Sequence, residues 1–430
     1  MIAPLVSSLA LLMLIGVPIS FALGIAGTIG LLIFDSSILI LVPQRIFSGV
    51  DSFPLMAVPF FVLAGELMGT TGILKRLLAL ASALVGHWRG GLAHVNITAS
   101  MVFAGISGSA IADASALGSA LIPSMEKAYK DRNFAAAVCA SAATIGPIIP
   151  PSIPMIVYAF VVGKVSIGGL FLAGVVPGIL IGVGMMVIVH IIALRRGFLP
   201  ESATRASLTE VLGKVREAFF ALLMPAIILG GIFFGVYTST EAAAIAVLYA
   251  LVVGFFITRE LRISDVVDAL RRSVVISSVV FLLVAMSNIV SFLLSASMLP
   301  AEVGQWIRSL SDNPLVFLLI VNLILLLLGC FLDNLAIMIM AAPVLAPVAA
   351  QFGIDPLHFG LVFVLNSVVG MLTPPVGAIL FTVCGIAKAP IEGVARQVLP
   401  FLAWQLCVLA IVTYVPSVCL ALPRLAGYVS

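Results

Sequence analysis

The sequence predicts an all-α polytopic membrane protein built from two structural repeats, and three observations carry this prediction. Of its 430 residues, 62% are hydrophobic and 9% are charged, whereas soluble domains carry about 25% charged residues. The long apolar runs are continuous rather than alternating, which favours spanning helices over barrel strands. Two breaks with the same Gly and Pro-Pro spacing, "GPIIPPS" (146–152) and "GMLTPPV" (370–376), interrupt these runs.

The apolar runs correspond to about ten to twelve spans, some of them incomplete, because roughly 20 apolar residues cross a bilayer. Residues 1–34 contain no charged side chain. We interpret them as a retained span rather than a removed signal peptide, since they lack a basic flank and a convincing small-residue cleavage site. The net charge of +3 is modest and argues for no nucleic-acid partner.

A basic connection, residues 195–217, divides the chain into a first half (1–194) and a second half (218–430). It holds five Lys or Arg residues, and a second basic cluster follows at Arg259, Arg262, Arg271 and Arg272. The positive-inside rule places both on the cytoplasmic side. Residues 218–258 lie between them and are long enough for two spans, which returns the chain to the same side.

Each half carries an acidic residue and a proline upstream of its break. In the first half Asp113 lies ten residues before Pro123. In the second half Asp333 lies ten residues before Pro343. The separation between the two acids is four positions shorter than the separation between the two Pro-Pro pairs. We therefore infer a four-residue length difference in the polar connection between proline and break.

These landmarks predict a re-entrant hairpin at about 105–130 and another at about 329–355, each followed by its broken helix at 146–152 or 370–376. Composition bias in a chain rich in Gly and Pro is the alternative explanation. Paired Gly/Pro-interrupted segments in corresponding halves are typical of secondary transporters. We expect the repeats to be inverted, which requires an odd number of spans in each half, a number that hydropathy does not settle.

The breaks predict ion-binding backbone. A Pro-Pro pair leaves several carbonyls without helical partners. Each unsatisfied group in hydrocarbon costs several kcal/mol, so such backbone must be buried in protein or line a watery cavity. Freed carbonyl oxygens suit a small cation, and the helix that begins beyond the break directs its positive end at an anion.

The acidic and small residues near the breaks have both functional and structural interpretations. Intramembrane carboxylates such as Asp113 and Asp333 are functional by default, but a helix N-cap remains the alternative for each. The run Ser107–Ser109 forms a hairpin tip or allows close helix packing. Thr373 contributes to an ion site or only satisfies a freed carbonyl.

Other polar residues predict less. Ser152 and Asn366 are candidate substrate contacts, with interhelical hydrogen bonding as an equal alternative. Glu66 and Glu241 are expected to make interhelical or interface contacts. The four histidines and five cysteines are scattered, which predicts no transition-metal site or disulfide framework. Neither a Walker A motif nor a hydrolase constellation occurs in the sequence, so we expect a protein that is not an enzyme and does not use ATP directly.

Several long stretches resemble the large membrane subunit of TRAP transporters, the tripartite ATP-independent periplasmic family, of the DctM type. The similarity covers essentially the whole chain. Ser239 stands where the family often has Pro, and this departure affects no ion ligand. The stretches are "SGVDSFPLMAVPFFVLAGELM", "LVGHWRGGLAHVN", "FAGISGSAIADASALGSALIP", "IGPIIPPSIPMIVY", "TSTEAAA" and "FGLVFVLNSVVGMLTPPVGAILF".

The resemblance implies a multi-pass protein of the bacterial cell inner membrane that imports an organic acid with sodium. It implies two protein partners, a small four-helix membrane subunit, expected as a separate chain, and a periplasmic substrate-binding protein. It further implies an elevator, in which a scaffold holds a mobile transport domain containing both hairpins and both broken helices. Which organic acid is carried is not predicted.

The resemblance also implies at least two sodium sites, each between a hairpin and a break. The residues implied for the first are Ser107, Gly108, Ser109, Gly146, Ile149 and Pro151. The residues implied for the second are Asp333, Asn334, Gly370, Thr373 and Pro375. A self-sufficient sodium/dicarboxylate carrier is the main alternative, and uptake without a binding protein would favour it. A channel is disfavoured because paired breaks suit an occluding site.

Overall fold

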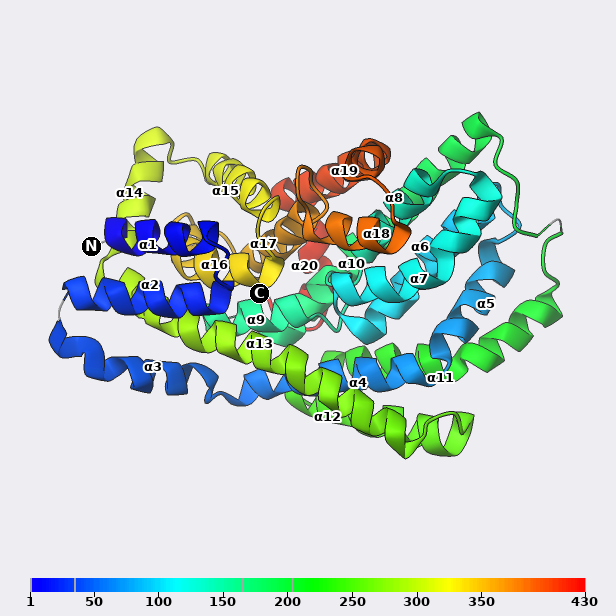
Figure 1. The fold of residues 1–430 in the computed structure, drawn as a ribbon, viewed down its shortest axis with the longest axis horizontal. Coiled ribbons are helices and arrows are strands. Elements are labelled where there is room, and N and C mark those ends of the chain that lie inside the picture. The colour runs from blue at the N-terminus through cyan, green and yellow to red at the C-terminus, as the bar shows by residue number, and fades with distance from the viewer. Residues whose placement is uncertain (1, 35, 164, 203, 430) are drawn as a thin grey trace.

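The computed structural model describes residues 2–34, 36–163, 165–202 and 204–429, and every regular element among them is helical, which confirms the all-α prediction (Figure 1). The elements before the first break are α1 (Ile2–Leu14), α2 (Ile19–Phe34), η1 (Ser36–Ile40), α3 (Leu41–Val50), η2 (Phe53–Met56), α4 (Ala57–Thr70), α5 (Ile73–Val85), α6 (Gly91–Ser107), α7 (Ala110–Tyr129) and α8 (Arg132–Ala143).

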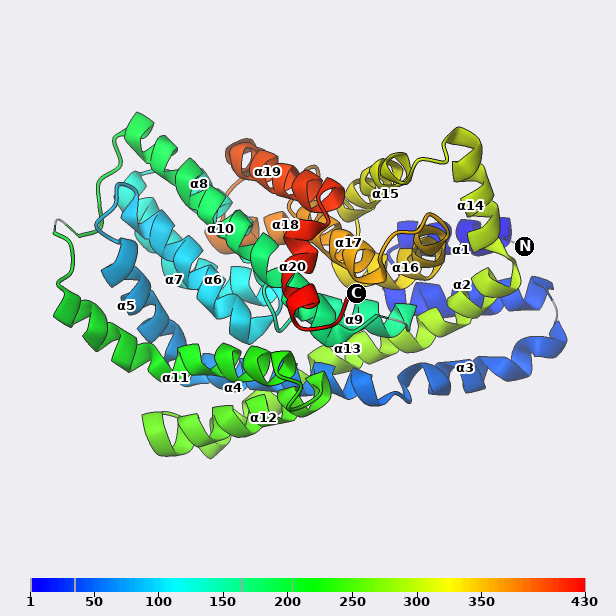
Figure 2. The same cartoon turned by 180° about the vertical axis from the view of Figure 1, so that it is seen from behind.

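The elements after the first break end with a short helix, α20, which packs against α10 and α17 (Figure 2). The remaining elements are α9 (Ile153–Val162), α10 (Ile167–Arg196), α11 (Leu208–Phe233), α12 (Ser239–Val252), η3 (Val253–Thr258), α13 (Ile263–Ala296), α14 (Leu299–Leu310), α15 (Pro314–Gly329), α16 (Asn334–Gln351), α17 (Pro356–Gly370), α18 (Ala378–Ala387), α19 (Ile391–Tyr414) and α20 (Ser417–Leu425).

Fewer helices than expected are long enough to cross a membrane. In the described part of the chain seven are long and apolar enough, and the pair α14–α15, bent by 116°, would make an eighth. The estimate of ten to twelve spans is higher because it counted several apolar helices of 10–17 residues, among them α6, α9, α17 and α18. At about 1.5 Å per residue, these cannot cross a core of about 30 Å alone.

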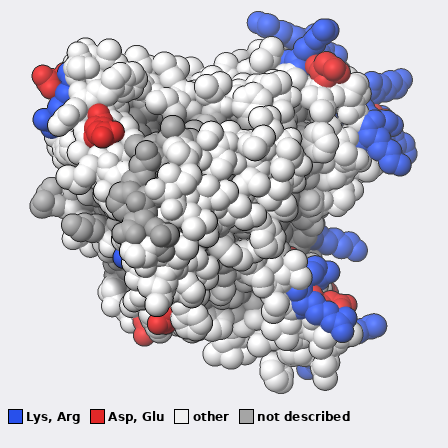
Figure 3. All heavy atoms as spheres, turned by 60° about the vertical axis from the view of Figure 1, so that its left-hand side comes forward, with Lys and Arg blue, Asp and Glu red and all other residues white. Residues whose placement is uncertain are grey.

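Most of the Lys and Arg side chains visible in Figure 3 lie along one edge of the molecule, the side that the sequence assigns to the cytoplasm. The connection there is shorter than the predicted 195–217, because α10 ends at Arg196 and α11 begins at Leu208. Ser207 starts α11 by accepting a hydrogen bond from the Glu210 backbone N–H at 3.2 Å. The two spans predicted over 218–258 are confirmed as α11 and the continuous pair α12–η3.

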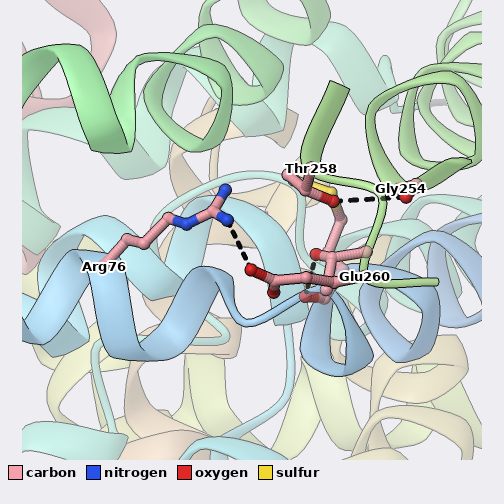
Figure 4. Close-up of polar contacts among 6 residues, drawn as sticks. Arg76, Gly254, Thr258 and Glu260 are labelled. Carbon is pink, nitrogen blue, oxygen red and sulfur yellow. Dashed lines mark hydrogen bonds and ion pairs between the residues drawn. The ribbon is translucent and has the colours of Figure 1, made fainter. Parts of the chain in front are cut away.

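On this side the turn before α13 is fastened to the start of α5 (Figure 4). Arg76 Nη2 lies 2.6 Å from Glu260 Oε1, and Thr258 Oγ1 donates to the Gly254 carbonyl at 3.2 Å. Gly72 has a φ of +66°, and a Cβ there would meet the Glu260 carboxylate. The glycine therefore lets this carboxylate lie against the positive N-terminal end of α5.

The helices of the two halves follow the same order with a constant offset in residue number. The starts of α7 and α16 differ in number by the same amount as those of α8 and α17, and as those of α10 and α19. Asp131 and Asp355 keep this offset and cap α8 and α17. The halves pack crosswise, since α7 lies against α18 and α16 lies against α9 (Figure 1).

This offset changes the pairing of the two carboxylates inferred from the sequence. Asp333 corresponds to Ser109, because both are the N-cap of the second helix of a hairpin. Asp113 lies one turn farther along its helix. The proline that corresponds to Pro123 is Pro347, one turn beyond the one chosen from the sequence. No four-residue length difference is therefore needed in the polar connection.

Candidate functional site

The first hairpin is α6–α7, and its tip is the turn at Gly108 and Ser109. Gly108 ends α6 with a φ of +61°, and Ser109 caps α7 by a long hydrogen bond of 3.5 Å from the Ala112 N–H. Asp113 is fully buried, its Oδ1 accepts from Ser107 Oγ, and its Oδ2 has no partner among the described residues. The cap is therefore Ser109, and Asp113 keeps one buried carboxylate oxygen available.

The first break, residues 144–152 between α8 and α9, closes onto this tip. Ser152 caps α9 by accepting from the Met155 N–H at 3.3 Å, and its hydroxyl donates to the Pro147 carbonyl. The Ile153 N–H donates to the Gly108 carbonyl at 3.4 Å. The Pro150–Pro151 peptide bond is cis. The start of α9 and the hairpin tip are thus joined backbone to backbone.

Two glycines allow this close approach. A Cβ on Gly146 would meet Asp113 Oδ2, and a Cβ on Gly108 would meet the Pro151 carbonyl oxygen. In the described chain no hydrogen bond reaches the carbonyl of Gly146 or Ile149. The structure therefore brings Gly146 of the break against the unpartnered oxygen of Asp113.

The second hairpin is α15–α16, with its tip at residues 330–333, and it closes onto the second break, residues 371–377. The Gly377 N–H donates to the Cys330 carbonyl at 3.0 Å. Asp333 caps α16, with Oδ2 accepting from the Leu335 N–H at 3.1 Å. The Pro374–Pro375 peptide bond is cis.

The second break also depends on glycine packing. A Cβ on Gly370 would lie 2.6 Å from the Cα of Gly329, and the reverse holds for Gly329. The two helices therefore touch through their backbones. Thr373 Oγ1 donates to the Val369 carbonyl at 2.9 Å, and this carbonyl also accepts from the Leu372 N–H at 3.1 Å, so both interpretations of Thr373 stay open.

The two candidate substrate contacts are hydrogen-bonded inside the protein. Asn366 is fully buried and donates to Asn322 Oδ1 at 2.7 Å, and Asn322 in turn donates to Thr413 Oγ1 at 3.0 Å. Ser152 is fully buried at the start of α9. Asn366 shows the interhelical hydrogen bond that was the alternative interpretation, whereas the hydrogen bonds of Ser152 are local, to Pro147 and Met155. Neither side chain lines the cavities that adjoin the hairpin tips.

Two adjoining cavities of about 400 and 450 Å³ separate the hairpin tips from α4 and α13. The first touches Gly108 and Ser109 of one tip, and Asp333 and Asn334 of the other. The second adjoins Ser107 and reaches the basic side. One space therefore meets tip residues of both predicted sodium sites, whereas the break residues predicted for those sites line neither cavity. The residues that line both cavities are Glu66, Ser109, Ala112, Ser115, Ile153 and Ile276.

Arg272 is a cavity residue that sequence reasoning missed. Its Nε lies 2.7 Å from Glu66 Oε2, and both side chains line the second cavity. The sequence showed Arg272 only as one of a basic cluster, and a hydropathy pattern does not tell which arginine of a pair faces inward. Glu66 makes the interhelical contact expected of it. Glu241 instead forms a capping box with Thr238 at the start of α12.

The histidines are closer together than their spacing suggested. The ring of His94 lies 6.0 Å from that of His190 and 5.1 Å from that of Trp88. Among the described residues, however, no three His, Cys, Asp or Glu side chains form a group that could hold a metal ion.

Residues 6–418 match the family model described as "Tripartite ATP-independent periplasmic transporter, DctM component". The chain belongs to the DctM family. This confirms the resemblance seen in the motifs, and it makes the chain a multi-pass transporter permease rather than an enzyme.

Curated relatives of this DctM protein align over nearly its full length. It is 42% identical over 418 residues to the sialic acid TRAP transporter large permease protein SiaM of Vibrio cholerae, covering 97% of each chain. It is 40% identical over 406 residues to the C4-dicarboxylate TRAP transporter large permease protein DctM of Pseudomonas aeruginosa, covering 94% of each. The isethionate TRAP transporter permease protein DctMQ of Oleidesulfovibrio alaskensis is 40% identical over 409 residues, which are 95% of this chain and 64% of that one.

The fold of this DctM protein is shared with a solved transporter. The crystal structure of the Alcanivorax borkumensis YdaH transporter, described as having an unusual topology, superposes with a TM-score of 0.67. The match covers 92% of this chain and 90% of that chain, at 13% sequence identity. At that identity the likeness concerns the fold alone.

Proposed function

We propose that the chain is the large subunit of a sodium-coupled secondary transporter that imports an organic acid. The supporting observation is that a similar backbone contact closes both halves. Ile153 and Gly377 are related by the offset that relates the helices of the two halves. Each donates its N–H to the carbonyl of its own hairpin tip, at 3.4 and 3.0 Å. Paired broken helices that meet at a central site are typical of sodium-coupled transporters.

In this proposal each tip and break enclose one sodium ion. Sodium requires oxygen ligands, and unwound backbone carbonyls commonly supply them in transporters. The first site contains Ser107, Gly108 and Ser109 of the tip, with Gly146, Ile149 and Pro151 of the break. Asp113 Oδ2, buried and unpartnered, fits this site as its anionic ligand. The second contains Asp333 and Asn334 of the tip, with Gly370, Thr373 and Pro375 of the break.

The proposed substrate class comes from the relatives and the cavity. The names of four relatives give sialic acid, C4-dicarboxylates, isethionate and 2,3-diketo-L-gulonate, the last for a protein of Escherichia coli. All four are organic anions. The cavities of about 400 and 450 Å³ have the size of small-molecule sites. The positive N-terminal ends of α7 and α16 adjoin them, which favours an anion.

We further propose that the two halves are inverted repeats that move as an elevator. The crosswise packing of α7 on α18 and α16 on α9 supports one body containing both hairpins and both breaks. The open end of the first hairpin lies on the basic side, where Asp131 pairs with Arg196 at 2.8 Å. The open end of the second hairpin lies away from that side, beside α14, where Arg308 donates to the Gln351 carbonyl at 2.8 Å. Opposed hairpins support the inverted relation.

The proposed partners are a small four-helix membrane subunit and a periplasmic substrate-binding protein, with the assembly in the bacterial cell inner membrane. The words "tripartite" and "periplasmic" in the family description support both.

The test is reconstitution of the three components in proteoliposomes with a radiolabelled anion. We expect uptake that requires both a sodium gradient and the binding protein, for one anion among succinate, sialic acid, isethionate and 2,3-diketo-L-gulonate. Uptake without the binding protein would instead indicate a self-sufficient carrier. Uptake unaffected by dissipating the sodium gradient would contradict the coupling.

A further inference from the structure

The cavity between the hairpin tips and α13 contains an arginine that is only partly engaged. Among the described residues that line the two cavities, Arg272 is the one with a positive charge. Its side chain is 54% exposed, and its ion pair with Glu66 uses Nε. A guanidinium carries five N–H donors, so its Nη groups remain able to bind a second carboxylate side by side.

The surroundings of Arg272 strengthen such an interaction. Val62, Phe103 and Ile276 provide apolar walls, while Ser107 and Ser109 of the first tip face the same space. A charge-assisted hydrogen bond between guanidinium and carboxylate is stronger in a cavity partly shielded from water than on an open surface. The planar fork of an arginine also fits a carboxylate better than a lysine ammonium does.

We propose that Arg272 binds the acidic group of the transported anion, a carboxylate or a sulfonate, from the α13 wall of the cavity, and that Glu66 holds the guanidinium in place and competes with the substrate for it. This inference rests on the proposed transport of an organic acid. It assigns one substrate contact to a helix outside the hairpins. Because Arg272 lies on the basic side, the contact forms when the anion faces the cytoplasm.

The alternative is an ordinary ion pair that fastens α4 to α13, worth about 0–1 kcal/mol at an accessible position. The two interpretations predict different effects of neutralising Glu66 on substrate binding. An ion pair loses the same interaction whichever partner is neutralised. If Arg272 binds the substrate, Arg272→Gln loses that contact. Glu66→Gln removes the carboxylate that competes with the substrate for the guanidinium.

The experiment is counterflow of radiolabelled succinate, sialic acid, isethionate and 2,3-diketo-L-gulonate in proteoliposomes containing the complete transporter, with the anion supplied at the cytoplasmic face. For the anion that the wild type exchanges, we expect Arg272→Gln to raise the half-saturating concentration at least tenfold. Arg272→Lys should raise it less, because the charge remains but the fork is lost. Glu66→Gln should leave it unchanged or lower it up to threefold.

The matched control is Arg271→Gln. The neighbouring Arg271 is 78% exposed in its side chain, lies 3.8 Å from Asp268, and does not line either cavity. We expect its half-saturating concentration to differ from that of the wild type by less than twofold. Size-exclusion profiles of the purified variants check that each remains folded.

Two results would overturn the inference while leaving the proposed function intact. One is a half-saturating concentration for Arg272→Gln equal to that of Arg271→Gln. The other is equal loss in Arg272→Gln and Glu66→Gln, with recovery in the exchanged double variant Glu66→Arg, Arg272→Glu. Wild-type protein that exchanges none of the four anions would overturn the proposed function, and the inference with it.

Discussion

The first hairpin tip carries a buried carboxylate, whereas the second presents its carboxylate to the cavity. Asp113 is fully buried, is held by Ser107, and keeps Oδ2 unpartnered beside Gly146. Asp333 is partly exposed, lines the cavity, and uses Oδ2 to cap α16. The two tips accept hydrogen bonds from corresponding backbone donors, Ile153 and Gly377, but the side chains of the two proposed sodium sites do not correspond. The two sites should therefore differ in how strongly sodium binding depends on the carboxylate.

The largest expected effect comes from the glycine contact found at the second break. In Gly370→Ala the added Cβ would lie 2.6 Å from the Cα of Gly329, so the two helices must separate. Overpacking costs about 1–3 kcal/mol, and we expect a lower melting temperature and little transport. Gly385→Ala is the control, because nothing lies within 4 Å of its added Cβ. Melting temperatures that agree for the two variants would contradict this packing.

The next effect compares the two carboxylates directly. Asn can still accept from Ser107 at position 113 and can still cap α16 at position 333, so Asp113→Asn and Asp333→Asn remove mainly the negative charge. We expect the sodium concentration for half-maximal uptake to rise more than tenfold in Asp113→Asn, because this carboxylate is the more buried, and about threefold in Asp333→Asn, on the scale of about 1.4 kcal/mol per tenfold. The reverse order, or no change in either, would refute the proposed difference.

A smaller effect is expected from the prolines. Pro151 is buried and Pro375 is exposed, so Pro151→Ala removes more buried apolar surface. At about 25 cal/mol per Å² of apolar surface, we expect Pro151→Ala to lower the melting temperature by several degrees and Pro375→Ala to lower it less. Differential scanning fluorimetry of the purified variants measures both. A larger loss in Pro375→Ala would show that burial is not the deciding factor.

The smallest effect concerns the caps that the halves share. Asp131 accepts from the Phe134 N–H at 2.9 Å, and Asp355 accepts from the Leu357 N–H at 2.8 Å. Loss of such a cap typically costs about 1 kcal/mol. We expect Asp131→Ala and Asp355→Ala to lower the melting temperature by similar amounts, and Asp312→Ala, at an exposed carboxylate, to leave it unchanged. Unequal shifts would mean that the Asp131–Arg196 ion pair contributes beyond the cap.

Much of the fold was predictable because its signals are local. The Pro-Pro pairs mark the breaks through the chemistry of proline, and the breaks lie between α8 and α9 and between α17 and α18. Continuous apolar runs located the long helices, including α11 and α12–η3. Short apolar helices were counted as spans, because a hydropathy pattern does not show where a helix turns back.

The candidate site was predictable only in part. The tip residues Ser107, Gly108 and Ser109 do adjoin the cavities, as do Asp333 and Asn334. The pairing of Asp113 with Asp333 was wrong, because two prolines one turn apart, Pro343 and Pro347, left the register of the second hairpin ambiguous. The structure resolves it through the helix starts.

Composition, apolar runs and paired breaks were sufficient to establish a helical membrane protein with corresponding halves, since each depends on residues close together in the chain. Tertiary structure decided which oxygen atoms meet and which charges face the cavity. Asp113 of α7 approaches Gly146 of the first break, and Arg272 of α13 approaches Glu66 of α4. Such approaches depend on how whole helices pack, and no local pattern of residues records that packing.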